Sequence, residues 1–318
     1  MSQEAASLPS VCVVIGSNRP GRLKAAVESV LRNDYPRLSL VVVAQGNAEG
    51  GGPSWAQREL GAQLSDARLR LVLDEGRGVS RARNIGMAND TSEIILFTDD
   101  DCIASPDWVA RHVARYRDEP STDMVFGAVL PPPGFTGADG EVPAFEPQKI
   151  VAQGRVEGDL VLGMGANMSA KRRVLEALGA FDEQIGPGSP LPSGEDIDLS
   201  LRAAARGMRV VVEPTASVWH DGVRAHGPES RVLWSRDGIG LGAVTAKCLR
   251  SGQYRAALML TKLVVKLNAE AAAAVISGRR PTGLRRATLF GRGALQGLAS
   301  GWRLRGTPST MQHRMSHD

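Results

Sequence analysis

The chain has 318 residues, of which 42% are hydrophobic and 23% charged, as expected for a folded α/β domain with an additional segment. Aromatic residues make up only 4%, which argues against the stacking platforms of proteins that bind single-stranded nucleic acid. The three cysteines, Cys12, Cys102 and Cys248, are far apart. They indicate neither a disulfide framework nor a zinc site and favour a cytoplasmic location.

Charge is distributed unevenly along the chain. The formal net charge is +4, but residues 247–318 alone hold thirteen Lys and Arg against two acidic residues, so the preceding part is acidic. This asymmetry indicates a polyanionic partner, either nucleic acid or an anionic membrane surface. Residues 1–10 lack the pattern of a signal peptide. Charged residues interrupt the hydrophobic stretch at 256–276, so we expect no membrane span.

The first part of the chain alternates short apolar runs with helical patterns. Strands are predicted at residues 11–15, 38–43, 69–73 and 93–97, and helices at 22–31, 55–64 and 80–87. Continuous apolar strands that alternate with helices predict a parallel sheet covered on both faces.

The second part of the chain is less regular. Strands are predicted at residues 124–130, 160–162 and 209–213, and helices at 171–178 and 196–205. From Val232 onward the pattern is that of amphipathic helices with basic faces. We therefore expect one main domain over residues 1–231 and a basic helical C-terminal region over 232–318.

Three consecutive aspartates, Asp99, Asp100 and Asp101, follow the predicted strand at 93–97. Open α/β sheets bind ligands at the carboxyl edge of their strands. Adjacent carboxylates repel one another, and Mg²⁺ or Mn²⁺ prefers oxygen ligands and also binds phosphate oxygens. The motif therefore predicts a metal that bridges aspartates to a diphosphate. Taken alone, it fits a solvated acidic turn equally well.

The segment GRGVSRARN at residues 76–84 places Arg83 and Asn84 at the start of a predicted helix. Its glycines permit close approach of the backbone to a ligand, and cationic side chains at a helix N-terminus favour a phosphate. By itself, a surface helix with solvated arginines is the simpler interpretation.

Two later features carry chemistry. The segment SGEDIDLSLR places Glu195 and Asp196 at a helix start, where acids stabilise the helix by about 0.3–1 kcal/mol. A carboxylate there could also accept a proton from an alcohol. His220 lies in VWHD, and a lone histidine of this kind is more often packed or exposed than a ligand.

Taken in chain order, these motifs resemble family 2 glycosyltransferases of the GT-A fold. The resemblance covers roughly residues 11–221 and includes VCVVIGSNRPGRL, SRARN, FTDDDC followed by WVARH, GMGANMSAKRRVLEALGAFDE, GEDIDLSLRAAARG and VWHD. It implies an α/β, Rossmann-like GT-A fold with a C-terminal helical appendage. It also implies inverting transfer of a sugar from a nucleotide-diphosphate sugar to an acceptor hydroxyl.

The resemblance also implies roles for individual residues. The general base maps to Asp196, beside Glu195. The ligands of Mg²⁺ or Mn²⁺ are expected to be Asp101, Asp99 and His220. The donor-binding residues are expected to be Gln45, Arg83, Asn84, Asp99, Asp100, Gly165 and Asn167.

One position departs from the family pattern. After the second strand the family usually carries an aspartate that helps to hold the nucleoside, whereas this chain has Ala44 and Gln45. Gln45 can hydrogen-bond a base but lacks the charge. The donor is therefore expected to be UDP-, GDP- or dTDP-linked, with the nucleotide left open.

Two other functions were weighed against glycosyl transfer. A sugar-phosphate nucleotidyltransferase also joins an α/β sheet to a carboxylate-bound metal, but GSNRPGRL matches its Gly-rich loop poorly. A non-catalytic nucleotide- or nucleic-acid-binding protein would use the basic tail, yet no nucleic-acid motif is present. We expect an acceptor glycan, lipid-linked sugar or small molecule as partner, and no nucleic acid.

We expect a separate role for the basic C-terminal region. Lys262, Lys266 and Glu270 recur every four residues and share one helix face, with apolar residues over much of the remainder. A basic amphipathic helix favours docking on an anionic membrane, here the cytoplasmic face. A helix packed on the main domain fits the pattern equally well.

Overall fold

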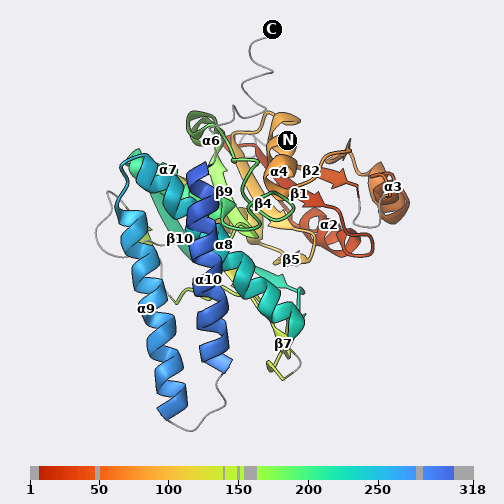
Figure 1. Cartoon of the computed structure of the whole chain (residues 1–318). Helices are drawn as coiled ribbons and strands as arrows, with labels where there is room; N and C mark the ends of the chain where they lie inside the picture. Colours follow the sequence, from red (N-terminus) through yellow and green to blue (C-terminus); the bar gives the residue numbers. More distant parts are fainter. Residues whose placement is uncertain are drawn as a thin grey trace.

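The computed structural model describes residues 7–46, 51–138, 140–148, 151–153, 163–276 and 282–303. A nine-stranded sheet forms its centre, in the order β3-β2-β1-β4-β9-β6-β10-β5, with β8 (Val151–Gln153) paired to β10 (Figure 1). The predicted strand at 160–162 lies outside the described residues.

The first four strands are parallel, as predicted. They are β1 (Val11–Ser17), β2 (Leu38–Gln45), β3 (Leu69–Asp74) and β4 (Ile94–Asp99). The helices between them are α2 (Leu23–Leu31), α3 (Trp55–Leu60), followed by a 3₁₀ turn at Gly61–Ser65, and α4 (Val79–Ala88).

Alternate residues of β1 enter two separate cores. Val11, Val13 and Ile15 pack with α2, whereas Cys12 and Val14 pack on the other face with α4. The strand is apolar at successive positions because both faces of the sheet are buried, and each buried Val or Ile contributes about 1.5–3 kcal/mol. This two-sided burial explains why the strand pattern was readable from the sequence.

The second half of the sheet is mixed rather than parallel. The strand β9 (Asn167–Lys171), which the sequence analysis did not predict, runs antiparallel to both β4 and β6 (Thr122–Leu130). The strand β10 (Arg209–His220) is parallel to β6 and continues past the predicted end at 213 through a register shift. Beyond that shift it pairs antiparallel with β5 (Cys102–Ala104).

The remaining elements cover the sheet and extend it at one end. Helix α5 (Trp108–Asp118) joins the α2 side, and α6 (Arg172–Leu178) and α7 (Glu195–Ala205) join the α4 side. The short strands β7 (Gly140–Glu141) and β11 (Arg224–Ala225) pair with each other.

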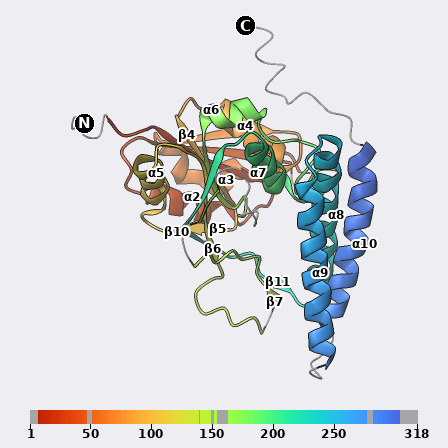
Figure 2. The same cartoon turned by 90° about the vertical axis from the view of Figure 1, so that its left-hand side faces the viewer.

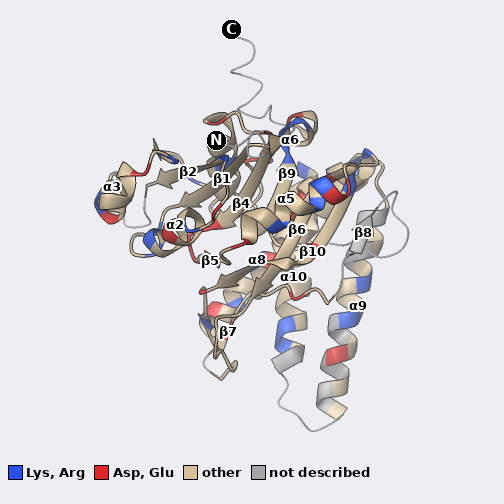
Figure 3. Ribbon diagram, turned by 180° about the vertical axis from the view of Figure 1, so that it is seen from behind, with Lys and Arg blue, Asp and Glu red and all other residues tan. Residues whose placement is uncertain are grey.

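Three long helices form the C-terminal region: α8 (Pro228–Arg250), α9 (Arg255–Ile276) and α10 (Thr282–Arg303). They stand side by side along one flank of the sheet domain (Figure 2). The expected domain boundary at 231/232 falls inside α8. Lys and Arg positions lie along α9 and α10, coloured blue on the ribbon (Figure 3). No described helix is long and apolar enough to cross a membrane.

Glycines allow α8 and α10 to pack with their backbones in contact. Gly293, Gly297 and Gly301 recur every four residues on one face of α10. A Cβ atom at Gly297 would lie 2.0 Å from the carbonyl oxygen of Ile239 on α8. A larger residue at this position would force the two helices apart, so the pair behaves as one packed unit.

Candidate active site

The aspartate cluster lies where β4 ends at the carboxyl edge of the sheet. Asp99 closes β4, and Asp100 and Asp101 form the turn into β5. Asp100 and Asp101 are buried at 3% and 5% exposure, whereas the Asp99 side chain is 31% exposed. The three carboxylates therefore differ in environment: two are held inside the protein and one faces the solvent.

Arg19, in the loop after β1, compensates the two buried aspartates. Its Nη2 contacts Asp100 and lies 2.9 Å from Asp101 Oδ2, and Ser17 Oγ also donates to Asp100. Burial disfavours the charged form of Asp101, but the positive charge of Arg19 and its hydrogen bond to this carboxyl outweigh that effect and lower the pKa of Asp101. Arg19 was not among the predicted site residues, although its NRPGR segment follows the first strand directly.

His220 meets Asp101 through the pairing of β10 with β5. His220 lies opposite Cys102 in the antiparallel register, and the amide of Asp221 donates to the Asp101 carbonyl at 2.7 Å. His220 Nε2 is 3.6 Å from Asp101 Oδ1. A Cβ atom at Gly222 would lie 2.3 Å from the imidazole ring, so only glycine leaves room there.

This group fits a divalent cation. One ligand atom each from Asp101, Cys102 and His220 lies within 4.8 Å of the others. Burial raises the pKa of Cys102 well above its usual range, and the hard cations Mn²⁺ and Mg²⁺ favour oxygen ligands over a thiol. Carboxylate and imidazole remain, a set that suits Mn²⁺ or Mg²⁺ together with phosphate oxygens.

Arg83 ties the aspartate cluster to the Glu-Asp pair of α7. Its guanidinium lies 3.1 Å from Asp99 Oδ1 and 2.9 Å from Glu195 Oε1, and the residue is only 2% exposed. The ring of Phe181 lies 5.4 Å away. Arg83 pairs with these two carboxylates and is not among the residues that line the pocket described below; the diphosphate contact predicted for it stays a prediction. Breaking such a buried ion pair costs about 3–5 kcal/mol.

Asp196 is held by backbone amides. Its Oδ2 accepts from the amide of Gly165 at 2.8 Å, and its Oδ1 accepts from the amide of Ile197 at 2.8 Å. Burial raises the pKa of Asp196, and burial together with the charge of Asp196 raises the pKa of Glu195. A carboxylate with a raised pKa is a stronger base, which matches the role predicted for Asp196.

Gly165 sits where the predicted donor and base residues meet. A Cβ atom there would lie 2.7 Å from Arg83 Nη1. A side chain at position 165 would therefore clash with Arg83. To relieve that clash, the backbone would have to shift, and the amide of residue 165 that donates to Asp196 would shift with it. The structure thus brings together Gly165, Arg83, Asp99, Glu195 and Asp196.

Asn84 and Asn167 lie apart from this group. Asn84 exchanges hydrogen bonds with the backbone of Phe181. Asn167, fully buried on β9, donates to the carbonyls of Ala128 and Ala216 and accepts from Trp108. Both side chains fix neighbouring segments, and the donor contacts predicted for them stay predictions.

Gln45, at the end of β2, lies beside Asp74 at the end of β3. Gln45 Nε2 donates to Asp74 Oδ2 at 2.9 Å, and the two residues are paired in the sheet register. Asp74 also receives three hydrogen bonds from Arg81. The position after β2 lacks the aspartate that is usual in the family, but Asp74 places a carboxylate at the end of the neighbouring strand β3.

A pocket of about 400 Å³ lies at this edge of the sheet. Gln45 lies in its wall, as do Asp99, Asp100, Asp101 and His220. Further lining residues come from the loop at Pro192–Ser193 and from helix α8. The pocket therefore runs from the end of β2 across the aspartates to the C-terminal helices.

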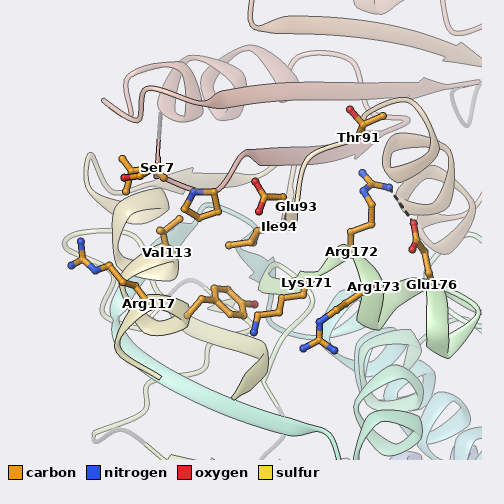
Figure 4. Close-up of a pocket in the computed structure, with 13 residues that line it drawn as sticks. Ser7, Thr91, Glu93, Ile94, Val113, Arg117, Lys171, Arg172, Arg173 and Glu176 are labelled. Carbon is orange, nitrogen blue, oxygen red and sulfur yellow. Dashed lines mark ion pairs between the residues drawn. The ribbon is translucent and has the colours of Figure 1, made fainter. Parts of the chain in front are cut away.

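A larger hollow of about 990 Å³ lies at the opposite edge of the sheet, where β4 begins (Figure 4). Lys171 and Arg172 line it, but Lys171 donates to the Pro120 carbonyl and Arg172 to three backbone carbonyls. These cations take part in packing contacts. The carboxylates are gathered at the carboxyl edge, which we take as the candidate active site.

The sequence model described as "Glycosyl transferase family 2" matches residues 11–179, more than half of the chain. The chain belongs to this family. Family 2 membership confirms the resemblance drawn from the motifs and favours glycosyl transfer over the nucleotidyltransferase and nucleic-acid-binding alternatives.

Curated relatives are also glycosyltransferases or glycan-biosynthesis proteins. The chain is 29% identical over 204 residues to the glucosyl-dolichyl phosphate glucuronosyltransferase of Haloferax volcanii, covering 61% of this chain and 62% of that protein. It is 26% identical over 236 residues to the succinoglycan biosynthesis protein ExoO of Rhizobium meliloti, covering 71% and 64%. The match thus spans less than two thirds of these relatives.

Solved structures show the same fold. The mannosyltransferase PcManGT from Pyrobaculum calidifontis, in complex with GDP-Man and Mn²⁺, aligns with a TM-score of 0.63 at 20% identity and covers 93% of this chain and 89% of that one. GalNAc-T7 with UDP, GalNAc and Mn²⁺ aligns with a TM-score of 0.50 at 16% identity, covering 75% and 50%. The predicted GT-A fold with a helical C-terminal part is confirmed.

Proposed function

We propose that the protein is a metal-dependent, inverting glycosyltransferase that moves a sugar from a UDP-, GDP- or dTDP-linked donor to an acceptor hydroxyl. The observation that carries this proposal is the meeting of Asp101 and His220, 3.6 Å apart, in the wall of a pocket at the carboxyl edge of the sheet. Two proteins of the same fold hold Mn²⁺ with GDP-Man or UDP, which supports the proposal.

The residues of the site have different proposed roles. Asp101 and His220 would hold Mg²⁺ or Mn²⁺, with Asp99 facing the ribose side of the donor or joining the metal shell. When bound, the metal neutralises charge on the leaving diphosphate as a Lewis acid. Gln45 contacts the nucleoside at the far end of the pocket.

Asp196 acts as general base. It takes the proton of the acceptor hydroxyl while that oxygen attacks the anomeric carbon and the bond to the diphosphate breaks on the opposite side. The amides of Gly165 and Ile197 hold the carboxylate in place for this transfer. The ion pairs of Arg83 with Glu195 and with Asp99 hold the start of α7, which carries Asp196, at a constant distance from the aspartate cluster.

The acceptor is proposed to be a lipid-linked sugar or a growing glycan. The two relatives are named for glucosyl-dolichyl phosphate and succinoglycan, and both fit this class. The proposed reaction therefore belongs to glycolipid or polysaccharide biosynthesis.

The test is a transfer assay with a panel of UDP-, GDP- and dTDP-sugars, Mn²⁺ and polyprenyl-phosphate-linked glucose, with the product linkage read by NMR. We expect one donor class to give a product whose anomeric configuration is inverted relative to the donor. A product with retained configuration would reject the single-displacement mechanism. Pyrophosphate release from a nucleoside triphosphate and a sugar phosphate, without transfer, would reject glycosyl transfer itself.

We further propose that the C-terminal helices dock on an anionic membrane, at the cytoplasmic face. Leu284, Leu295 and Trp302 are spaced along one face of α10 and are 51%, 70% and 60% exposed. Four exposed basic residues lie on the same helix: Arg285, Arg286, Arg292 and Arg303. An apolar face with a basic rim favours the surface of an anionic bilayer.

The membrane proposal predicts a loss of vesicle binding when the apolar face of α10 is made polar. Each apolar side chain that leaves water contributes about 1.5–3 kcal/mol, so Leu295→Gln with Trp302→Gln should weaken binding to phosphatidylglycerol vesicles by about 100-fold or more in flotation. Leu64→Gln, on an exposed site of the sheet domain, is the matched control. Equal flotation of the double variant and wild type would contradict the proposal.

A further inference from the structure

Helix α8, which lies beyond the segment that matches the family model, contributes to the active-site pocket. Leu233, Arg236 and Asp237 line the hollow beside Asp101 and His220. Their spacing of three and four residues places them on one face of the helix. The pocket is therefore closed on this side by the helical region and not by the sheet domain.

The packing of α8 fixes this face next to the proposed base. A Cβ atom at Gly240 would lie 2.2 Å from the carbonyl oxygen of Ser193, so the helix backbone lies directly on the loop. Ser193 Oγ donates to Asp237 Oδ1 at 3.3 Å, and Arg236 Nη2 donates to the Pro192 carbonyl at 3.2 Å. This loop leads into Glu195, where α7 begins.

The groups proposed to bind the donor and the metal occupy the rest of the pocket, which leaves the α8 side for the acceptor. Gln45 marks the nucleoside end of the pocket, and the Asp101–His220 pair marks the position proposed for the diphosphate. The acceptor hydroxyl must reach Asp196, and the loop that precedes Asp196 packs against α8. The acceptor therefore enters between the metal-binding carboxylates and α8.

Arg236 differs from the other arginines of the pocket. Arg19 and Arg224 lie 2.9 Å and 4.0 Å from Asp101, so both face the aspartate cluster. Arg236 is half-buried on the α8 wall and donates to a backbone carbonyl through one nitrogen. A guanidinium has five N–H donors in a planar fork that matches two oxygens of a phosphate.

We propose that α8 forms the acceptor subsite and that Arg236 binds a phosphate group carried by the acceptor. This inference rests on the proposed glycosyl transfer and names the chemical class of its acceptor. A lipid-linked phosphate and a water-soluble sugar phosphate would present the same group to Arg236.

The test compares Arg236→Gln with wild type on three acceptors: polyprenyl-phosphate-linked glucose, glucose 1-phosphate and the neutral octyl glucoside. Loss of a charge-assisted contact should raise KM for the phosphorylated acceptors by about 10–100-fold. The kcat, the donor Kd and the KM for octyl glucoside should change less than about twofold, because the contacts that hold Asp101, His220 and Asp196 do not involve Arg236. The phosphorylated acceptor that wild type uses identifies the source of the phosphate.

Arg231→Gln is the matched control, because Arg231 is exposed on the same helix and does not line the pocket. An equal rise in KM for neutral and phosphorylated acceptors would overturn the proposal, as would a weaker donor Kd or no change at all. If wild type forms no product with any donor and acceptor, the proposed glycosyl transfer fails instead. The melting temperature of Arg236→Gln confirms that the variant is folded.

Discussion

Asp196→Asn is expected to lower kcat by about 10²–10⁴-fold while the donor Kd stays within about twofold of wild type. The substitution keeps the size of the side chain but removes its ability to take a proton. Asp196 is not among the residues that line the active-site pocket, so donor affinity should survive. Single-turnover kinetics and a donor titration on the same preparation measure the two quantities.

A matched control separates chemistry from folding. Asp118→Asn makes the same change on an exposed side chain at the end of α5 and should keep full activity. The asparagine at 196 offers one acceptor oxygen to the two amides that bind Asp196, so a small loss of stability is expected as well. Near-normal kcat for Asp196→Asn would assign the base elsewhere.

The parallel half of the fold could be predicted because its signals are local. Successive apolar residues in β1 and β2 report burial on both faces, and each run ends at a polar or glycine-rich segment. The aspartate cluster was visible for the same reason, since it follows the apolar strand β4. The antiparallel strand β9 was missed because its sequence, NMSAK, has few of the residues that mark a strand.

The assembly of the site depended on contacts between distant segments. His220 looked like an ordinary lone histidine, and only the pairing of β10 with β5 brings it to Asp101. Arg83 lies in a segment that favours phosphate binding, and its ion-pair partners in the structure, Asp99 and Glu195, come from two other elements. Sequence spacing holds no information on such contacts, because strand order and register decide them.

The role of α8 was hidden for a related reason. Its sequence predicts an amphipathic helix, and nothing in that pattern tells which surface it covers. The close approach at Gly240 places it on the loop before Glu195 and makes it part of the pocket. The helical region is thus joined to the site that the family motifs form.

Asp101 is proposed to hold a divalent cation that in turn binds the donor diphosphate. Asp101→Ala should therefore remove the Mn²⁺-dependent part of nucleotide affinity. Loss of outer-shell partners of a metal already costs about 10–100-fold in affinity, so loss of a direct ligand should cost at least as much. Asp118→Ala, an exposed aspartate outside the pocket, is the matched control.

The most direct measurement is calorimetric titration of wild type and Asp101→Ala with UDP, GDP and dTDP, each with Mn²⁺ and with EDTA. We predict that wild type binds at least one of these nucleotides more tightly with Mn²⁺, and that Asp101→Ala abolishes this difference. If both proteins show the same Mn²⁺-dependent gain in affinity, Asp101 does not hold the cation.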